Sequence, residues 1–364
     1  MGSLHDAAGR RFAPRQWFPG IPELNTSQSI PVADSSQVSA ARRSAAALAR
    51  SLSFNETCSG SLSIVVTEAA TNLLKHGGGG EIILRESTHG GIAAVSVLAL
   101  DKGPGCENTA LCLQDGFSTA GSAGTGLGAI KRLSDAFDFH SHPGTGTALF
   151  VKIASQKPNH RNDAPIDSIG GISLPKSGET ESGDAWAVYE QPQRQVLMVA
   201  DGLGHGPFAA EAARAAVAAF EDCRDCTIDR MMDAAKGTMI ATRGGCVAIS
   251  EVDHDHRGIR FCGIGNIAGV VARPDSQRSM VSLNGTVGRG QSKSRIFEYP
   301  WEDGNLLVMH SDGLQSQWSI SKIPGLFLCH PELIAGVLYR DYTRGRDDVS
   351  VVVARLSVNR GAGG

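Results

Sequence analysis

Apolar runs with the length of β-strands fill the second half of this 364-residue chain, and they constrain its fold most strongly. Between them, helical periodicity occurs only at 207–221, at 228–241 and near 331–339. Many strands with few intervening helices favour a layered α+β sandwich over a wound parallel sheet. The strand-like runs are AWAVYE, QVLMVAD, GCVAISEVD, IRFCGIGNIAGVVAR, NLLVMHSD and DVSVVVARL.

The first half mixes helical and strand patterns. Asp34 or Ser36 is the expected N-cap of its first helix. Helices are expected at 38–52, 61–76 and 128–137, and strands at 81–86, 92–101 and 147–153.

A polar stretch with two prolines, ASQKPNHRNDAP, separates the halves and predicts a linker. No internal repeat is visible. The predicted division is a loose arm at 1–25, a first domain at 26–153, the linker at 154–165, a second domain at 166–358 and a tail at 359–364.

Composition and charge exclude several classes of protein. The formal net charge is −3, which favours neither nucleic acid nor an anionic membrane as a partner. The first residues lack the apolar core of a signal peptide, Asp6 stands where a myristoylation signal needs Ser or Thr, and no run has the length of a membrane span. A soluble cytoplasmic protein is expected.

Eight cysteines are scattered along the chain. Only Cys223 and Cys226, in CRDC, have metal or redox spacing, and no second pair accompanies them. We therefore expect reduced thiols rather than a zinc site.

The helix expected at 61–76 has one polar face. Glu68, Asn72 and Lys75 share that face, because residues four and seven apart lie on the same side of a helix. Leucines, valines and alanines occupy the opposite face. For an isolated helix, this pattern would indicate only a solvated surface.

Two glycine-rich segments follow that helix. Asp101 ends a strand and precedes Gly103 and Gly105, and the string GTGLG opens the next helical segment. Glycines at the start of a helix let backbone N–H groups approach phosphates. A Rossmann site is disfavoured because a polar segment, and not a strand, precedes the glycines, and no P-loop motif occurs.

These motifs resemble a known family. EAATNLLKH, DKGPG, GTGLGAIKRL and GTGTALF are similar to the N-box and glycine boxes of the Bergerat-fold (GHKL) ATPases. The longer string DGFSTAGSAGTGLGAIKRLSDAFDFHSHPGTGT resembles the RsbT-like serine/threonine switch kinases of bacterial partner switching. Histidine kinases share the boxes, but no pair of long helices with a phosphoacceptor histidine precedes them.

The resemblance implies roles for individual residues. Asn72 would bind the Mg²⁺ that bridges the ATP phosphates, Glu68 would orient or deprotonate the attacking hydroxyl, and Asp101 would accept a hydrogen bond from the adenine amino group. Phosphoryl transfer depends on such positioning and charge neutralisation. The other candidate nucleotide-binding residues are Lys75 on the polar helix face, Gly103 and Gly105 at the adenine, Gly124, Gly126 and Gly128 in the phosphate lid, and Thr147 at the pocket floor.

Aspartates stand at the edges of the apolar runs in the second half. Several converging carboxylates would repel one another and take up protons unless cations neutralised them. All-oxygen ligands select Mg²⁺ or Mn²⁺ over zinc, and two such ions can activate a water against a phosphoryl group. Any one Asp alone would more often be a turn or cap residue. The aspartates are Asp184, Asp201, Asp312, Asp347 and Asp348.

The strings SLPKSGETESGDAW, VADGLGHG, SLNGTVG, MHSDGL and RDDVSVVV resemble, in order, the metal-dependent PPM protein phosphatases of the RsbX-like and SpoIIE-like branch. The resemblance implies a fold of an N-terminal Bergerat α/β sandwich followed by a PPM-type α-β-β-α sandwich. It also implies two Mn²⁺ or Mg²⁺ ions, with Asp347 favoured over Asp348. For His205, a catalytic role and a helix-capping role both stay open. The implied metal ligands are Asp184, Asp201, the carbonyl of Gly202, Asp312 and Asp347 or Asp348.

Three functional hypotheses follow. The first is a bifunctional kinase and phosphatase acting on a STAS-domain protein of the anti-sigma-antagonist type, in sigma-factor or stress signalling. In the second, the GHKL module binds ATP and a partner without transferring phosphate. In the third, the two activities have different targets. The native metal, the upstream signal and the oligomeric state stay open.

Overall fold

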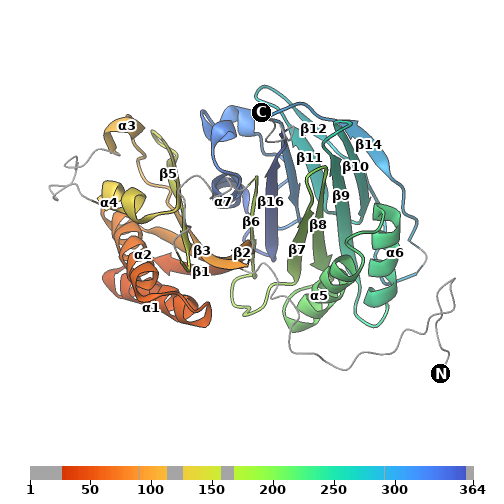
Figure 1. The fold of residues 1–364 in the computed structure, drawn as a ribbon, viewed down its shortest axis with the longest axis horizontal. Coiled ribbons are helices and arrows are strands. Elements are labelled where there is room, and N and C mark those ends of the chain that lie inside the picture. Colours follow the sequence, from red (N-terminus) through yellow and green to blue (C-terminus); the bar gives the residue numbers. More distant parts are fainter. Residues whose placement is uncertain (1–26, 90, 113–125, 157–167, 291, 358–364) are drawn as a thin grey trace.

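Three β-sheets and the helices that cover them form the computed structural model of this chain, which describes residues 27–89, 91–112, 126–156, 168–290 and 292–357. Figure 1 shows the first sheet with its helices at one end of the molecule and the other two sheets, packed face to face, at the other end. Helix α7 (Pro331–Tyr342) lies between the two parts.

The first half is one antiparallel sheet with helices on one face. The strand order is β1-β2-β3-β5-β4. Asp34 caps α1 through a capping box with Gln37, and the Asn55 side chain caps α2. The elements are β1 (Ser27–Val32), α1 (Ser35–Ser51), α2 (Glu56–His76), β2 (Gly80–His89), β3 (Ile92–Leu100), α3 (Thr109–Cys112), α4 (Gly126–Leu133), β4 (Ala136–His142) and β5 (Gly146–Ala154).

The second half is a sandwich of two sheets. One has the order β13-β10-β9-β8-β7, with β14 paired to β10, and the other has the order β12-β11-β15-β16-β6. The strands are β6 (Ile169–Leu174), β7 (Asp184–Glu190), β8 (Arg194–Gly202), β9 (Gly245–Asp253), β10 (Gly258–Ile264), β11 (Ala268–Ala272), β12 (Gln277–Ser279), β13 (Ser282–Leu283), β14 (Phe297–Pro300), β15 (Leu306–His310) and β16 (Val349–Arg355). The helices are α5 (Pro207–Asp222), α6 (Ile228–Met239), α7, and the 3₁₀ turns Ile320–Lys322 and Leu326–Leu328.

The packing gives the expected α-β-β-α order in the second half. Helices α5 and α6 cover the outer face of the β7–β10 sheet, and a separate core lies between the two sheets. The outer face of the β6–β16 sheet packs on α7. The same core continues into the outer face of the first sheet, through Ile83, Leu98 and Phe150. The two halves therefore share one hydrophobic core.

Several expectations about local structure were wrong. The helix expected at 128–137 ends at Leu133, and β4 begins at Ala136. The apolar run at 259–273 is two strands, β10 and β11, which belong to different sheets. The strands β1 and β6 were not expected. The strands β1, β6 and β11 pair with β2, β16 and β15, which are distant in the sequence, and β4 pairs with the next strand, β5. Local periodicity does not report such pairing.

The expectation of reduced thiols was wrong for four cysteines. Cys223 forms a disulfide with Cys226, and Cys106 with Cys112. The end of α5 explains the first pair, because a turn from Cys223 O to Cys226 N brings the two Cα atoms to 5.2 Å. The other four cysteines are buried free thiols.

Within the described ranges, no helix combines the length and the apolar character that crossing a bilayer requires. The predicted arm at 1–25 and the tail at 359–364 lie outside these ranges, as does most of the predicted linker.

Two candidate active sites

The polar face of α2 meets the first turn of α4. A Cβ atom placed on Gly126, the first residue of α4, would lie 3.3 Å from Glu68 Oε2 and 3.6 Å from both amide atoms of Asn72. The opposite face of α2 is buried, including Leu62, Val66 and Leu73. Glu68 and Asn72 are thus held against the start of a helix, where backbone N–H groups can receive an anion.

The loop after β3 forms the second wall of this site. Asp101 is 7% exposed, and its Oδ1 accepts hydrogen bonds from the backbone N–H of Gly103 (2.8 Å) and of Thr147 (3.1 Å). Burial raises the pKa of Asp101, and these two hydrogen bonds oppose the rise. Gly103 must be a glycine for packing, because a Cβ there would lie 2.7 Å from Gly77 Cα. The second oxygen of Asp101 can accept a donor such as an adenine amino group.

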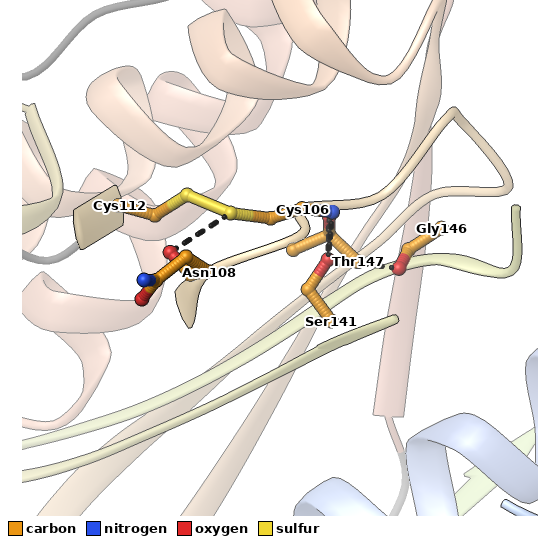
Figure 2. Close-up of a disulfide and its surroundings, with 6 residues drawn as sticks. All are labelled: Cys106, Asn108, Cys112, Ser141, Gly146 and Thr147. Carbon is orange, nitrogen blue, oxygen red and sulfur yellow. Dashed lines mark hydrogen bonds between the residues drawn. A yellow bond between two sulfur atoms is a disulfide. The ribbon is translucent and has the colours of Figure 1, made fainter. Parts of the chain in front are cut away.

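Thr147 belongs to a small network beside Asp101. Ser141 Oγ lies 3.1 Å from Thr147 Oγ1 and accepts a hydrogen bond from Cys106 N at 2.8 Å (Figure 2). The Cys106–Cys112 disulfide ties the following segment to the same place (Figure 2). The pocket floor is therefore held from two sides. The strands β4 and β5 lie on one side, and the loop after β3 lies on the other.

The other residues predicted to bind the nucleotide lie on α2, in the first turn of α4 and in the loop after β3, apart from one that is not described. Lys75 is exposed on α2, and Gly126 and Gly128 lie in the first turn of α4. Gly105 has φ +71°, and a Cβ there would lie 2.1 Å from His142 O, so only glycine fits. Gly124 lies outside the described residues.

The second site is built at the edge of the β7–β10 sheet. The antiparallel register places Asp184, at the start of β7, opposite Asp201, near the end of β8. Burial raises the pKa of Asp184 well above its usual range, and the negative charge of Asp201 adds to this rise. Burial also raises the pKa of Asp201 to about 8, with added repulsion from Asp312, Asp347 and Asp348. The carboxylates therefore lie close enough to disfavour one another's charge.

Asp347 and Asp348 differ in what surrounds them. Asp348 is buried, and its two oxygens accept the backbone N–H of Lys176 (2.7 Å) and of Gly183 (2.9 Å). Asp347 is exposed, and its Oδ1 accepts the N–H of Asp348 at 3.0 Å. Asp348 thus fixes the loop before β7, whereas Asp347 keeps an oxygen for another ligand.

Polar neighbours that are not among the predicted metal ligands complete this site. Asn266 Nδ2 donates to Asp312 Oδ2 at 2.6 Å, and Ser311 Oγ donates to Asp184 Oδ2 at 2.5 Å. Burial raises the pKa of Asp312 and the charge of Asp347 adds to it, while Arg344 and Asn266 oppose the rise. Asn266 lies in the turn between β10 and β11, so recognising that these are two strands would have located it.

His205 does not cap α5. The N-cap is Gly206, which makes no side-chain cap hydrogen bond, and His205 Nδ1 lies 2.6 Å from Glu179 Oε1. The capping alternative for His205 was therefore wrong.

The donor set of the second site suits a hard divalent cation. Its side chains are carboxylates that raise one another's pKa, a mutual repulsion that a divalent cation relieves. Gly202 also has no room for a side chain, because a Cβ would lie 2.1 Å from Ala209 O. Among the described residues, no group of three His, Cys, Asp or Glu side chains already stands in a metal-binding arrangement. The metal-ligand assignments stay predictions.

Two family models match the chain. Residues 32–153 match the histidine kinase-like ATPase domain, and residues 191–357 match stage II sporulation protein E (SpoIIE). The chain is 29% identical over 126 residues to the serine/threonine-protein kinase RsbT of Bacillus subtilis (strain 168), covering 35% of this chain and 95% of that kinase.

Solved structures also resemble parts of the chain. The PP2C phosphatase domain of SpoIIE from Bacillus subtilis, with a fragment of its regulatory domain, has a TM-score of 0.46 at 18% identity, over 74% of this chain and 80% of that one. RsbX in complex with magnesium has a TM-score of 0.45 at 22% identity, over 51% of this chain and 94% of that one. The domain assignment rests on the family models and on the kinase relative. Both expected domain types, and their order, are confirmed.

Proposed function

We propose that this chain, which joins a histidine kinase-like ATPase domain to a SpoIIE-type domain, is a bifunctional regulator of protein phosphorylation. The first half transfers the γ-phosphoryl group of ATP to a serine or threonine of a protein, and the second half hydrolyses phosphoserine or phosphothreonine. One observation carries the proposal: each half brings its own acidic residues to its own site, Glu68 on α2 in the first half and Asp184 opposite Asp201 in the second.

In the first half, Glu68 and Asn72 act together at the start of α4. Glu68 accepts the proton of the attacking hydroxyl, and the Asn72 side-chain oxygen would hold the magnesium ion that accompanies ATP. Asp101 accepts a hydrogen bond from the adenine amino group through the oxygen that Gly103 and Thr147 do not use. The backbone N–H groups at the start of α4 approach the phosphates.

In the second half, the carbonyl of Gly202 and the carboxylates of Asp184, Asp201, Asp312 and Asp347 would hold two Mn²⁺ or Mg²⁺ ions. Asp184 stands opposite Asp201 and is oriented by Ser311. Such ions supply charge neutralisation and an activated water. Asn266 orients Asp312, and Asp348 holds the loop that leads to Asp184.

The proposed substrate is a STAS-domain protein of the kind that antagonises anti-sigma factors. Support comes from the likeness of the first half to the serine/threonine-protein kinase RsbT and of the second half to SpoIIE, because a kinase and a phosphatase catalyse opposing reactions. A kinase and a phosphatase on one chain would set the phosphorylation level of that partner locally. A sigma-factor or stress-signalling pathway is the proposed context.

Two single variants test the proposal. Glu68→Gln should abolish transfer of labelled phosphate from ATP to the STAS protein and leave hydrolysis of the phosphorylated STAS protein intact. Asp312→Asn should do the reverse. Label transfer and phosphate release are measured separately, with Mg²⁺ and Mn²⁺ present.

Equal loss of both activities in either variant would contradict two separate sites. If the wild-type chain binds ATP and the STAS protein but transfers no label, the first half is a binding module, which is the alternative function. Hydrolysis without any metal requirement would refute the assignment of the second half.

A further inference from the structure

Helix α7 belongs to the second half by sequence but contacts the first half along its whole length. Near its N-terminus, Glu332 is paired with Arg85 of β2, and in its middle Gly336 packs against Leu98 and Leu100 of β3. Figure 1 shows α7 between the two parts of the molecule. Its C-terminal turn reaches the end of the first sheet that carries the adenine-side residues.

Arg340, in that turn, is buried in the contact, with its side chain 5% exposed. Its Nη1 donates to the carbonyl oxygen of Asp101 at 3.1 Å and to that of Thr147 at 3.3 Å. Its Nε and Nη2 donate to the two carboxylate oxygens of the neighbouring Asp341, at 2.8 Å each. Asp341 therefore holds the guanidinium plane on α7. The remaining nitrogen, Nη1, binds the backbone of the first half at Asp101 and at Thr147.

The two residues that receive Arg340 are the ones that form the adenine side of the proposed pocket. Asp101 directly follows β3 and Thr147 lies in β5, and Asp101 N also donates to Thr147 O at 3.0 Å. The Asp101 side chain in turn accepts the N–H of Thr147. Arg340 thus bridges two carbonyls whose relative position sets the direction of the Asp101 carboxylate.

We propose that Arg340 is a positioning residue of the nucleotide site, so that the second half of the chain completes the adenine pocket of the first half. This inference rests on the proposed function, because it requires that ATP binds at Asp101. Arg340 acts through the backbone of Asp101 and Thr147, and it contacts neither Glu68 nor Asn72, which lie at the phosphate end. It should therefore govern nucleotide affinity and not the transfer step.

Electrostatics support the same role. Burial raises the pKa of Asp101, whereas the charges of Arg340 on α7 and of His76 on α2 oppose the rise. Asp341, the other charged group beside Arg340, pairs with the guanidinium. Removing the guanidinium would move the loss of the Asp101 negative charge to higher pH.

The test compares three variants of the full-length chain. Arg340→Met keeps the length of the side chain and removes its donors, and Arg340→Lys keeps a charge that can reach a carbonyl. Tyr339→Phe is the matched control, because it removes a hydrogen bond of the adjacent α7 residue to Glu81 of β2 and leaves both bonds of Arg340 to the backbone of Asp101 and Thr147 in place. ATP dissociation constants are measured by calorimetry between pH 5 and 8, and KM and kcat for ATP are measured with the STAS substrate.

Loss of a charge-assisted hydrogen-bond bridge predicts a rise of about tenfold to a hundredfold in the ATP dissociation constant of Arg340→Met. The lysine variant should recover part of the affinity, Tyr339→Phe should stay within about twofold of wild type, and kcat should be unchanged. The pH at which binding falls should be higher in Arg340→Met than in Tyr339→Phe.

Two results would overturn the inference. One is wild-type affinity in Arg340→Met, and the other is an equal loss with the same pH profile in Arg340→Met and Tyr339→Phe, which would show a general effect of the domain contact. Binding is read directly, so a wild-type chain that binds ATP but transfers no phosphate refutes the kinase proposal and leaves this test valid. A wild-type chain that binds no ATP refutes both.

Discussion

Replacing Asp201 by asparagine should change how the stability of the metal-free protein depends on pH. Asp201 lies opposite Asp184 in the β7–β8 ladder, and burial with the charges of Asp312, Asp347 and Asp348 raises its pKa from 3.8 to about 8. Asparagine has a similar shape but does not titrate. The comparison therefore isolates the proton that this carboxyl holds.

The sign follows from where the proton is bound. The unfolded chain releases it near pH 3.8, whereas the native protein keeps it until about pH 8. Between these values the native state binds one more proton, so the free energy of unfolding falls as the pH rises. The slope is about 1.4 kcal/mol per pH unit for one proton, or roughly 4 kcal/mol between pH 4 and pH 7.

Urea unfolding in the presence of a chelator, at pH 5, 6, 7 and 7.5, measures this slope. In Asp201→Asn the fall should be smaller than in wild type by about one proton, or roughly 3 kcal/mol over that range. Asp275→Asn, an exposed position between β11 and β12, is the control and should keep the wild-type slope. Mn²⁺ should stabilise the wild type more at pH 7.5 than at pH 5, because metal displaces the proton.

Equal slopes in wild type and Asp201→Asn would refute the reasoning. They would mean that the native carboxyl of Asp201 is ionised at neutral pH without metal, so that the carboxylates do not repel one another strongly. The electrostatic argument for the divalent ions would then fail.

Two further changes test the packing around the sites. Arg85→Met should lower the free energy of unfolding by about 3–5 kcal/mol, because it leaves the buried carboxylate of Glu332 without the cation that lies 2.5 Å from it. Urea unfolding measures this loss, and the double variant with Glu332→Leu should recover most of it. Gly202→Ala should abolish phosphate release while ATP binding persists, because the added Cβ would lie 2.1 Å from Ala209 O and displace the loop that follows β8; phosphate release at the wild-type rate would contradict the close approach.

Much of this protein could be predicted from local sequence patterns. The Asp34 cap, the buried face of α2 and the boundaries of β9 follow from propensity and periodicity, which act over a few residues. The motif positions of Glu68 and Asn72 also follow from local order, because one helix turn places them on one face. The two domain types were predicted from the resemblance of the motifs to known families and are confirmed by the family models.

Only the tertiary structure decided how the two halves meet. Glu332 pairs with Arg85, 247 positions away in the sequence, and Arg340 binds Asp101, 239 positions away. No local sequence pattern predicts either contact. The split of the run at 259–273 into β10 and β11 has the same origin, because each strand is placed by partners in a different sheet. Apolar periodicity reports that a face is buried, but the identity of the surface that buries it depends on the packing of the whole chain. For α7 that surface is a second sheet, one that belongs to the other half of the protein.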